Sequence, residues 1–461
     1  MSFLIILAAL VLLMFVAYRG YSVILFAPVA ALLAVLLTDP SHVAPIFSGI
    51  FMEKMVGFIK LYFPVFMLGA IFGKVIELSG FSKSIVSSVI RLVGRERAML
   101  SIVLVCAILT YGGVSLFVVV FAVYPFAAEM FKQSGIPKRL IPGTIALGAF
   151  TFTMDSLPGT PQIQNIIPTT FFKTNTWAAP WLGVIGSVFI LIVGLLYLNW
   201  RRRQAMAKGE GYGTDLHNEP EPFEAEKLPN PWVAILPLVL VGVLNKLFTS
   251  LIPQIYGKTF SMSLAGHPLT VEIPAISAIW AVEGALLVGI LSVIAFAFKR
   301  VMARFADGSK AAVAGSLLAS MNTASEYGFG GVIAALPGFS VVADALKVIP
   351  NPLVNEAVTV TVLAGITGSA SGGMSIALAA MSNTFIQAAN AANIPLEVLH
   401  RVASMASGGM DTLPHNGAVI TLLAVTGLTH KTSYADIFAV TCIKTSAVFV
   451  AIATYYLFGI Y

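Results

Sequence analysis

Long apolar runs follow one another along almost the whole chain, separated by short polar or Gly/Pro-rich segments. A membrane-spanning helix needs ~20 mostly apolar residues. Eight runs have a length that suits a single crossing, and several more are longer and interrupted. The eight single runs cover 2–18, 21–37, 58–78, 177–200, 231–252, 276–298, 311–336 and 434–458. The pattern predicts an all-α polytopic membrane protein.

Four further apolar stretches contain a break. The stretches 98–132 and 353–392 are too long for one helix, and each has a glycine pair near its middle. We expect each to be a re-entrant helical hairpin, with two complete spans as the alternative. The stretches 139–172 and 396–428 instead break at a Pro-containing turn that begins with an aspartate, and we expect them to be discontinuous transmembrane helices.

These breaks occur twice in the same order, which indicates an internal repeat. Matching residues are separated by 256 to 260 positions throughout. The matches are Gly80-Phe81-Ser82 with Gly338-Phe339-Ser340, Gly112-Gly113 with Gly372-Gly373, Ile136-Pro137 with Ile394-Pro395, and Asp155-x-Leu157-Pro158 with Asp411-x-Leu413-Pro414.

Basic residues favour the cytoplasmic side of a membrane, and their distribution predicts that the repeats are inverted. The polar linker 201–230 and the loop around 299–310 are rich in Lys and Arg, whereas the loop 253–275 has only Lys258. Both termini then lie outside, with about ten spans plus two hairpins. The expected regions are N-terminal helices in 1–57, the first repeat in 58–200, a cytoplasmic linker in 201–230, connecting helices in 231–310, and the second repeat in 311–461.

Composition excludes most other classes of protein. Hydrophobic residues make up 58% of the 461 positions and charged residues only 10%, so the chain cannot cover a surface in water. The net charge of +6 comes from small groups of basic residues between apolar runs. This distribution is typical of residues that set the orientation of membrane helices, not of a nucleic-acid-binding surface. No phosphate-binding loop or Cys/His metal spacing occurs, so we expect no cofactor, no metal and no enzyme activity. An intramembrane aspartyl protease is a weak alternative, because no glycine directly precedes Asp411.

The breaks and hairpin tips supply the candidate binding residues. Unpaired backbone groups are tolerated at membrane depth only where they face a site or a cavity, and the ends of broken helices suit ions. The glycines and hydroxyls have an alternative role in close helix packing and in bonding to their own helices. The candidate substrate-binding residues are Gly112, Gly113, Ser115, Ser156, Thr160, Gln162, Ser371, Gly372, Gly373, Ser375, Thr412, His415 and Asn416.

Asp155 and Asp411 hold equivalent positions in the two breaks. Carboxylates in the hydrocarbon layer are costly and usually face an interior site. Each is a candidate for ion coupling by binding a proton or Na⁺, with capping of backbone N–H groups as the structural alternative. His415, which breaks the repeat symmetry, is a third candidate for the coupled proton. Glu326 is the best further contributor among the other charges within apolar runs.

The two break blocks resemble the gluconate permease family of bacterial organic-anion:proton symporters. The resemblance covers about residues 20–460 and is strongest in Gly135-Ile136-Pro137 to Pro161 and in Asn393-Ile394-Pro395 to His415. It implies elevator-type movement, a homodimer and a bacterial plasma (inner) membrane location. The first break lacks the His-rich, Pro-Pro-containing loop of gluconate-specific members, and the sequence is closer to the 3-hydroxybutyrate permease branch.

The hypothesis from the sequence is therefore a secondary active transporter that imports a small monocarboxylate with H⁺. No arginine is evident near the inferred site, which favours one carboxylate over a di- or tricarboxylate. The alternatives are a symporter of gluconate or another sugar acid, Na⁺ coupling in place of H⁺, and a cation/proton antiporter with no organic substrate.

Overall fold

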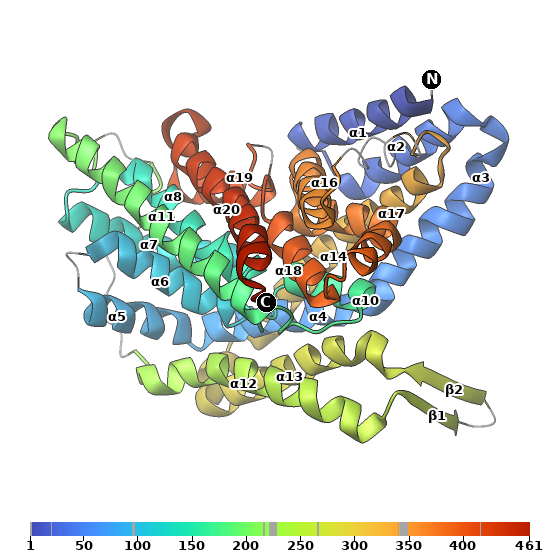
Figure 1. Cartoon of the computed structure of the whole chain (residues 1–461). Coiled ribbons are helices and arrows are strands. Elements are labelled where there is room, and N and C mark those ends of the chain that lie inside the picture. Colours follow the sequence, from blue (N-terminus) through green and yellow to red (C-terminus); the bar gives the residue numbers. More distant parts are fainter. Residues whose placement is uncertain are drawn as a thin grey trace.

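The computed structural model describes residues 2–19, 21–94, 97–214, 217–220, 228–264, 267–339, 341, 349–414 and 416–461. Within these residues the chain is almost entirely helical (Figure 1), which confirms the predicted class of polytopic all-α membrane protein. Ser340 and His415, both named above, lie outside the described residues. Five described helices are long and apolar enough to cross a membrane by themselves, and shorter apolar helices form hairpin arms and half-helices.

The first repeat contains one long helix, a helical hairpin and a broken helix, in that order. It is preceded by α1 (Ser2–Tyr18), α2 (Val23–Thr38), a 3₁₀ turn (Pro40–His42), α3 (Val43–Ile46) and a π-helical turn (Phe47–Phe51). The repeat itself consists of α4 (Met52–Leu78), α5 (Phe81–Val93), the hairpin of α6 (Ala98–Tyr111) and α7 (Leu116–Gln133), a 3₁₀ turn (Lys138–Leu140), the broken helix of α8 (Ile141–Ala149), α9 (Phe152–Asp155) and α10 (Ile163–Phe172), and α11 (Pro180–Ala207).

The second repeat has the same order of elements. Two helices, α12 (Pro231–Tyr256) and α13 (Ile273–Met302), connect it to the first. It consists of α14 (Phe305–Ala335), the hairpin of α16 (Pro352–Thr367) and α17 (Ala370–Ala391), the broken helix of α18 (Leu396–Ser407) and α19 (Gly417–Thr426), and α20 (His430–Phe458).

The equivalent helices α4 and α14 pack against each other in opposite directions. Leu78, at the end of α4, lies against Gly308 near the start of α14, whereas Lys54 near the start of α4 lies against Gly331 near the end of α14. Because these helices occupy the same place in the two repeats, the repeats are inverted. They also interlock, since α10 packs on α17 of the other repeat and α19 packs on α7.

A short β-hairpin interrupts the helical architecture between α12 and α13 (Figure 1). Strands β1 (Thr259–Leu264) and β2 (His267–Glu272) pair antiparallel, with Thr259 opposite Glu272 and Leu264 opposite His267. Polar and apolar residues alternate through β1, a period that suits a strand. The pattern of long apolar runs predicts only a loop over 253–275 and gives no sign of these strands.

The described part of the polar linker folds back over α7 and α8. Lys138 pairs with Glu219 at 2.6 Å, and Arg139 donates two hydrogen bonds to Glu210 at 2.6 and 2.8 Å. Asn218 donates to the carbonyl of Ala424 at the end of α19. The linker therefore contacts both repeats.

Candidate functional site

The first break lies between α8 and α10 and consists of a short helical turn followed by irregular backbone. Helix α8 ends at Ala149, and α9 contributes one turn that ends at Asp155. Two prolines and a glycine follow before α10, which prevents the helix from continuing. Ser156 donates to the Asp155 carboxylate at 2.7 Å, and Thr160 donates to the Thr153 carbonyl at 2.9 Å. Both hydroxyls are thus used within the break.

The second break lies between α18 and α19 and ends at a helix cap. The Asn416 side chain accepts hydrogen bonds from the backbone N–H groups of Ala418 and Val419 at 2.7 and 3.0 Å, and so caps α19. The Thr412 hydroxyl is hydrogen-bonded to the Thr441 hydroxyl of α20. This break is therefore tied to the last helix as well as to its own second half.

Each break is joined to the hairpin tip of its own repeat by a side-chain amide. Gln162 donates to the Thr110 carbonyl at 2.7 Å, where α6 ends. Asn416 donates to the Gly368 carbonyl at 2.7 Å, where α16 ends. The two amides precede α10 and α19 directly, so they occupy equivalent positions. The structure thus brings each predicted hairpin tip together with its predicted break.

The first hairpin tip is closely packed. Gly113 has φ +96°, a conformation that favours glycine, and it lies against Pro161 of the first break. Gly112 lies against Leu238 of α12, where a side chain would overlap that leucine. Ser115 is half-buried and precedes α7, with its backbone nitrogen close to Gly73 of α4.

The second hairpin tip packs on α14. The Ser371 and Thr323 hydroxyls are hydrogen-bonded at 3.2 Å, and Gly372 lies directly against the Glu326 carboxyl group. Gly373 packs on the backbone of α16 at Ala364, which holds the two arms of the hairpin together. Ser375 is fully buried, and its hydroxyl has no hydrogen-bond partner among the described residues.

The two breaks meet at a buried cluster of charges. Lys444 of α20 is paired with Asp411 and also donates to the Phe150 carbonyl at 2.9 Å, so it joins the second break to the first. Asp155 lies against the backbone of Gly408, and both Lys444 and Asp411 act on it electrostatically. All three charged side chains are buried.

Arg401 of α18 completes the cluster, contrary to the expectation of a site without arginine. Its side chain is 0% exposed and donates to the carbonyls of Ala178 at 2.8 Å and Asp155 at 3.3 Å, and to the Asn165 side chain at 3.1 Å. The guanidinium N–H groups therefore form hydrogen bonds within the protein. Two basic side chains, Arg401 and Lys444, are thus buried together with Asp155 and Asp411 where the two breaks meet.

Sequence reasoning missed both cations. Arg401 lies in α18 together with Glu397 and His400, and Lys444 lies well inside the apolar part of α20. A basic residue at such a position is a signal that deserved equal attention with the aspartates. Within the described residues no group of three or more His, Cys, Asp or Glu side chains is placed to hold a metal ion. His415 lies outside the described residues, so its position relative to the cluster is not assigned.

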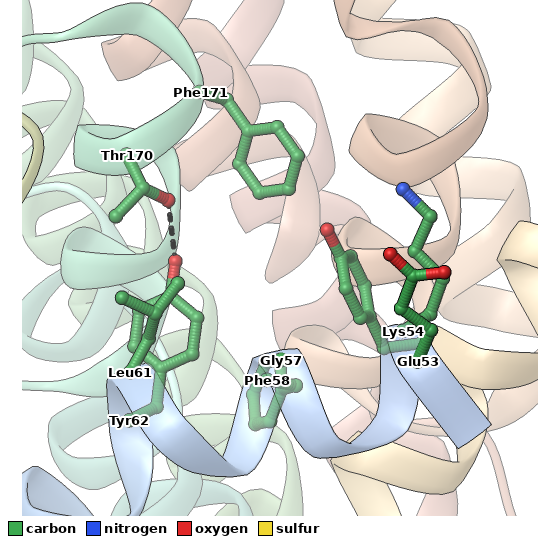
Figure 2. Close-up of a pocket in the computed structure, with 9 residues that line it drawn as sticks. Glu53, Lys54, Gly57, Phe58, Leu61, Tyr62, Thr170 and Phe171 are labelled. Atoms are coloured by element: carbon green, nitrogen blue, oxygen red, sulfur yellow. Dashed lines mark hydrogen bonds between the residues drawn. The ribbon is translucent and has the colours of Figure 1, made fainter. Parts of the chain in front are cut away.

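A separate pocket of about 260 Å³ lies between α4, α10 and α14 (Figure 2). Aromatic rings dominate its lining, and Phe58 and Phe171 both stack near Tyr327 at centroid distances of 5.6 and 6.2 Å. Tyr62 and Thr170 share a hydrogen bond of 2.5 Å, at the left of Figure 2. None of the sequence-predicted binding residues lines this pocket. The complete lining is Glu53, Lys54, Gly57, Phe58, Leu61, Tyr62, Thr170, Phe171 and Tyr327.

Comparison with known proteins identifies a close relative. The chain is 62% identical over 471 residues to the uncharacterized transporter YxjC of Bacillus subtilis (strain 168), and the alignment covers all of both chains. No protein-family model matches the chain.

Two solved transporter structures share the fold. The YdaH transporter of Alcanivorax borkumensis has a TM-score of 0.50 at 14% identity, covering 92% of this chain and 90% of its own. MtrF of Neisseria gonorrhoeae, described as illuminating a class of antimetabolite efflux pumps, has a TM-score of 0.54 at 12% identity, covering 91% and 84%. With its relatives and its spanning helices, the chain is a multi-pass protein of the bacterial plasma membrane.

Proposed function

This chain belongs to the family of the transporter YxjC, and on that premise we propose that it imports a small organic monocarboxylate together with a proton. A short hydroxy acid similar to 3-hydroxybutyrate is the favoured substrate. The resemblance of both break blocks to the gluconate permease family, and to its 3-hydroxybutyrate branch in particular, supports this substrate class.

One observation carries the proposal: the two hairpin tips and the two helix breaks are connected to one another inside the helical bundle. Gln162 and Asn416 each join a break to a hairpin tip, and Lys444 joins the two breaks. Irregular backbone at membrane depth is stable only where it is enclosed by protein or faces a water-filled or ligand-filled site. Paired breaks from inverted repeats are the usual construction of a substrate site in secondary transporters.

The charges at this meeting point support a ligand with a single carboxylate. Arg401 is occupied by carbonyl groups and Lys444 by Asp411, so neither is a free cation for a second or third carboxylate. The half-helix starting at Ile163 and the hairpin arm starting at Ala370 present partly positive N-termini to one anionic group. The proposed binding residues remain those of the tips and breaks given in the sequence analysis.

We further propose that the hairpins and broken helices move together across the membrane in an elevator-type motion, within a homodimer. Both features follow from the resemblance. Gluconate and other sugar acids are the alternative substrates. The pairing of Asp411 with Lys444 argues against the cation/proton antiporter, because a fixed positive charge at this carboxylate repels Na⁺.

The proposal is tested by uptake of labelled 3-hydroxybutyrate into proteoliposomes under an inward proton gradient without Na⁺. Concentrative uptake that collapses with a protonophore supports the proposal, and competition by gluconate and other carboxylates ranks the substrates. Uptake that requires Na⁺ moves the coupling to sodium. Absence of uptake under both gradients overturns monocarboxylate import.

The aromatic pocket favours one second candidate, the export of a compound that contains a ring. MtrF, which shares the fold, is described as an antimetabolite efflux pump. Four aromatic residues line the pocket in Figure 2, and flat rings pack well against them. Efflux of a labelled aromatic compound from preloaded vesicles, driven by the opposite proton gradient, distinguishes this function from import of 3-hydroxybutyrate.

A further inference from the structure

Glu326 of α14 is a buried carboxyl group that lacks the compensation found at the two aspartates. It is only 3% exposed, and its Oε2 atom has no hydrogen-bond partner among the described residues. Asp155 and Asp411 are instead held by Ser156 and Lys444. A buried carboxylate without a partner is costly, so this group is most stable when it carries a proton or meets an oppositely polarised group.

The oppositely polarised group is the first turn of α17, at the second hairpin tip. The Glu326 carboxyl group lies so close to Gly372 that a Cβ atom there would overlap it. Helices α14 and α17 run side by side in the same direction, since Thr323 contacts Ser371 and Gly330 contacts Ile376. The N-terminal end of a 22-residue helix carries partial positive charge, which attracts an ionised carboxylate.

Charged groups on the neighbouring elements do not neutralise Glu326. Burial disfavours its ionised form, and its Oε2 atom has no hydrogen-bond partner among the described residues. The elements α2 and α17 contain no charged residue. The charged groups that α4, α13 and α14 itself contribute are Glu53, Lys54, Lys60, Lys74, Glu77, Glu283, Lys299, Arg300, Asp307 and Lys310.

We infer that Glu326 is the residue that carries the coupled proton and that its contact with Gly372 transmits its protonation state to the second hairpin tip. This inference rests on the proposed proton-coupled function. It assigns the proton to α14 instead of to Asp411, which is paired with Lys444, or to Asp155, which accepts a hydrogen bond from Ser156. Tyr327, the next residue along α14, lines the aromatic pocket, whereas Glu326 points to Gly372 of α17 and does not line that pocket.

The coupling step is a simple protonation. A proton from water adds to a carboxylate oxygen of Glu326, forms one O–H bond and removes one negative charge. The attraction between α14 and the first turn of α17 then weakens, and the hairpin tip is freed to move. Loss of the proton on the other side restores the attraction. No other bond changes and no co-reactant is needed.

The first test is independent of substrate. Full-length protein in liposomes is examined by infrared difference spectroscopy between acidic and alkaline buffer, comparing the wild type with Glu326→Gln and with Glu283→Gln as a control on α13. We expect the carbonyl band of protonated carboxylic acids to lose one component in Glu326→Gln and to be unchanged in the control. Glu356 of α16, which is fully buried and has no hydrogen-bond partner for either oxygen among the described residues, contributes its own component in all three proteins. An identical band in Glu326→Gln overturns the assignment.

The second test uses labelled 3-hydroxybutyrate in proteoliposomes. With one proton per substrate and no membrane potential, a gradient of one pH unit supports about tenfold accumulation. Glu326→Gln is expected to reduce accumulation to the equilibrium level while it still exchanges internal for external substrate, and Glu283→Gln is expected to accumulate normally. Normal accumulation by Glu326→Gln overturns the inference. If the wild type itself does not accumulate the substrate, the proposed function fails, and the infrared titration still decides the role of Glu326.

Discussion

Lys444 and Asp411 form an ion pair whose two side chains are almost completely buried. The pair links the last helix to the second break, and through the Phe150 carbonyl it reaches the first break as well. A buried pair of this kind stabilises little compared with apolar packing, but removal of one partner leaves an uncompensated charge.

Replacing Lys444 by Met is therefore expected to destabilise the protein by about 3–5 kcal/mol. The double variant Lys444→Met/Asp411→Asn is expected to recover much of that loss, because it removes both charges. Thermal unfolding of the protein in detergent measures the difference. Lys299→Met, at an exposed lysine of α13, is the matched control and should unfold close to the wild type. Equal losses in the single and double variants would contradict the pairing.

Gly408→Ala tests the close approach of the two breaks. A Cβ atom at this position would overlap the Asp155 carboxylate, so the breaks must separate, at a cost of about 1–3 kcal/mol. Gly417→Ala is the control, because no atom lies within 4 Å of its added Cβ. Melting temperature and uptake should both fall in Gly408→Ala only. Wild-type behaviour of that variant would show that Asp155 does not lie against Gly408.

Asn416→Asp separates the two roles of this side chain. An aspartate keeps the acceptor that caps α19 but has no N–H to donate to the Gly368 carbonyl. We expect nearly unchanged thermal stability and substantially reduced uptake, because the second hairpin tip is no longer tied to the break. Asn416→Ala removes both contacts, and we expect it also to lower the free energy of unfolding by about 1 kcal/mol, because the helix cap is lost. Full uptake by Asn416→Asp would exclude a role for this tie in transport.

The contact between Arg139 and Glu210 predicts a pH dependence of stability. The two hydrogen bonds from the Arg139 guanidinium hold the pKa of Glu210 below its usual value. The contribution of the ionised Glu210 to the stability of the fold is therefore complete above its unfolded-state pKa, about 4.3. That contribution is lost as the pH falls through its lower folded-state pKa. The pair is partly exposed, so the effect is below about 1 kcal/mol. Melting temperatures of the wild type and Glu210→Gln should differ at neutral pH and converge in acid.

Several features of this protein could be predicted from local sequence. The apolar runs are long enough to require a membrane, and proline and glycine interrupt four of them because these residues cannot continue a helix. Asp155 and Asp411 were found because the repeat places them at equivalent positions. The inversion of the repeats was predicted from basic residues, and the antiparallel packing of α4 on α14 confirms it.

The partners of the charged residues were decided only by the tertiary structure. Lys444 is 33 residues from Asp411 and 294 from Phe150, and Arg401 is 246 from Asp155, so no local spacing connects them. A lone lysine or arginine in an apolar helix has the same sequence signature whether it extends to the membrane surface or pairs in the interior. Packing removes water from some of these groups and supplies counter-charges to some of them. It therefore distinguishes Asp411, which is paired with Lys444, from Glu326, whose Oε2 atom has no hydrogen-bond partner among the described residues.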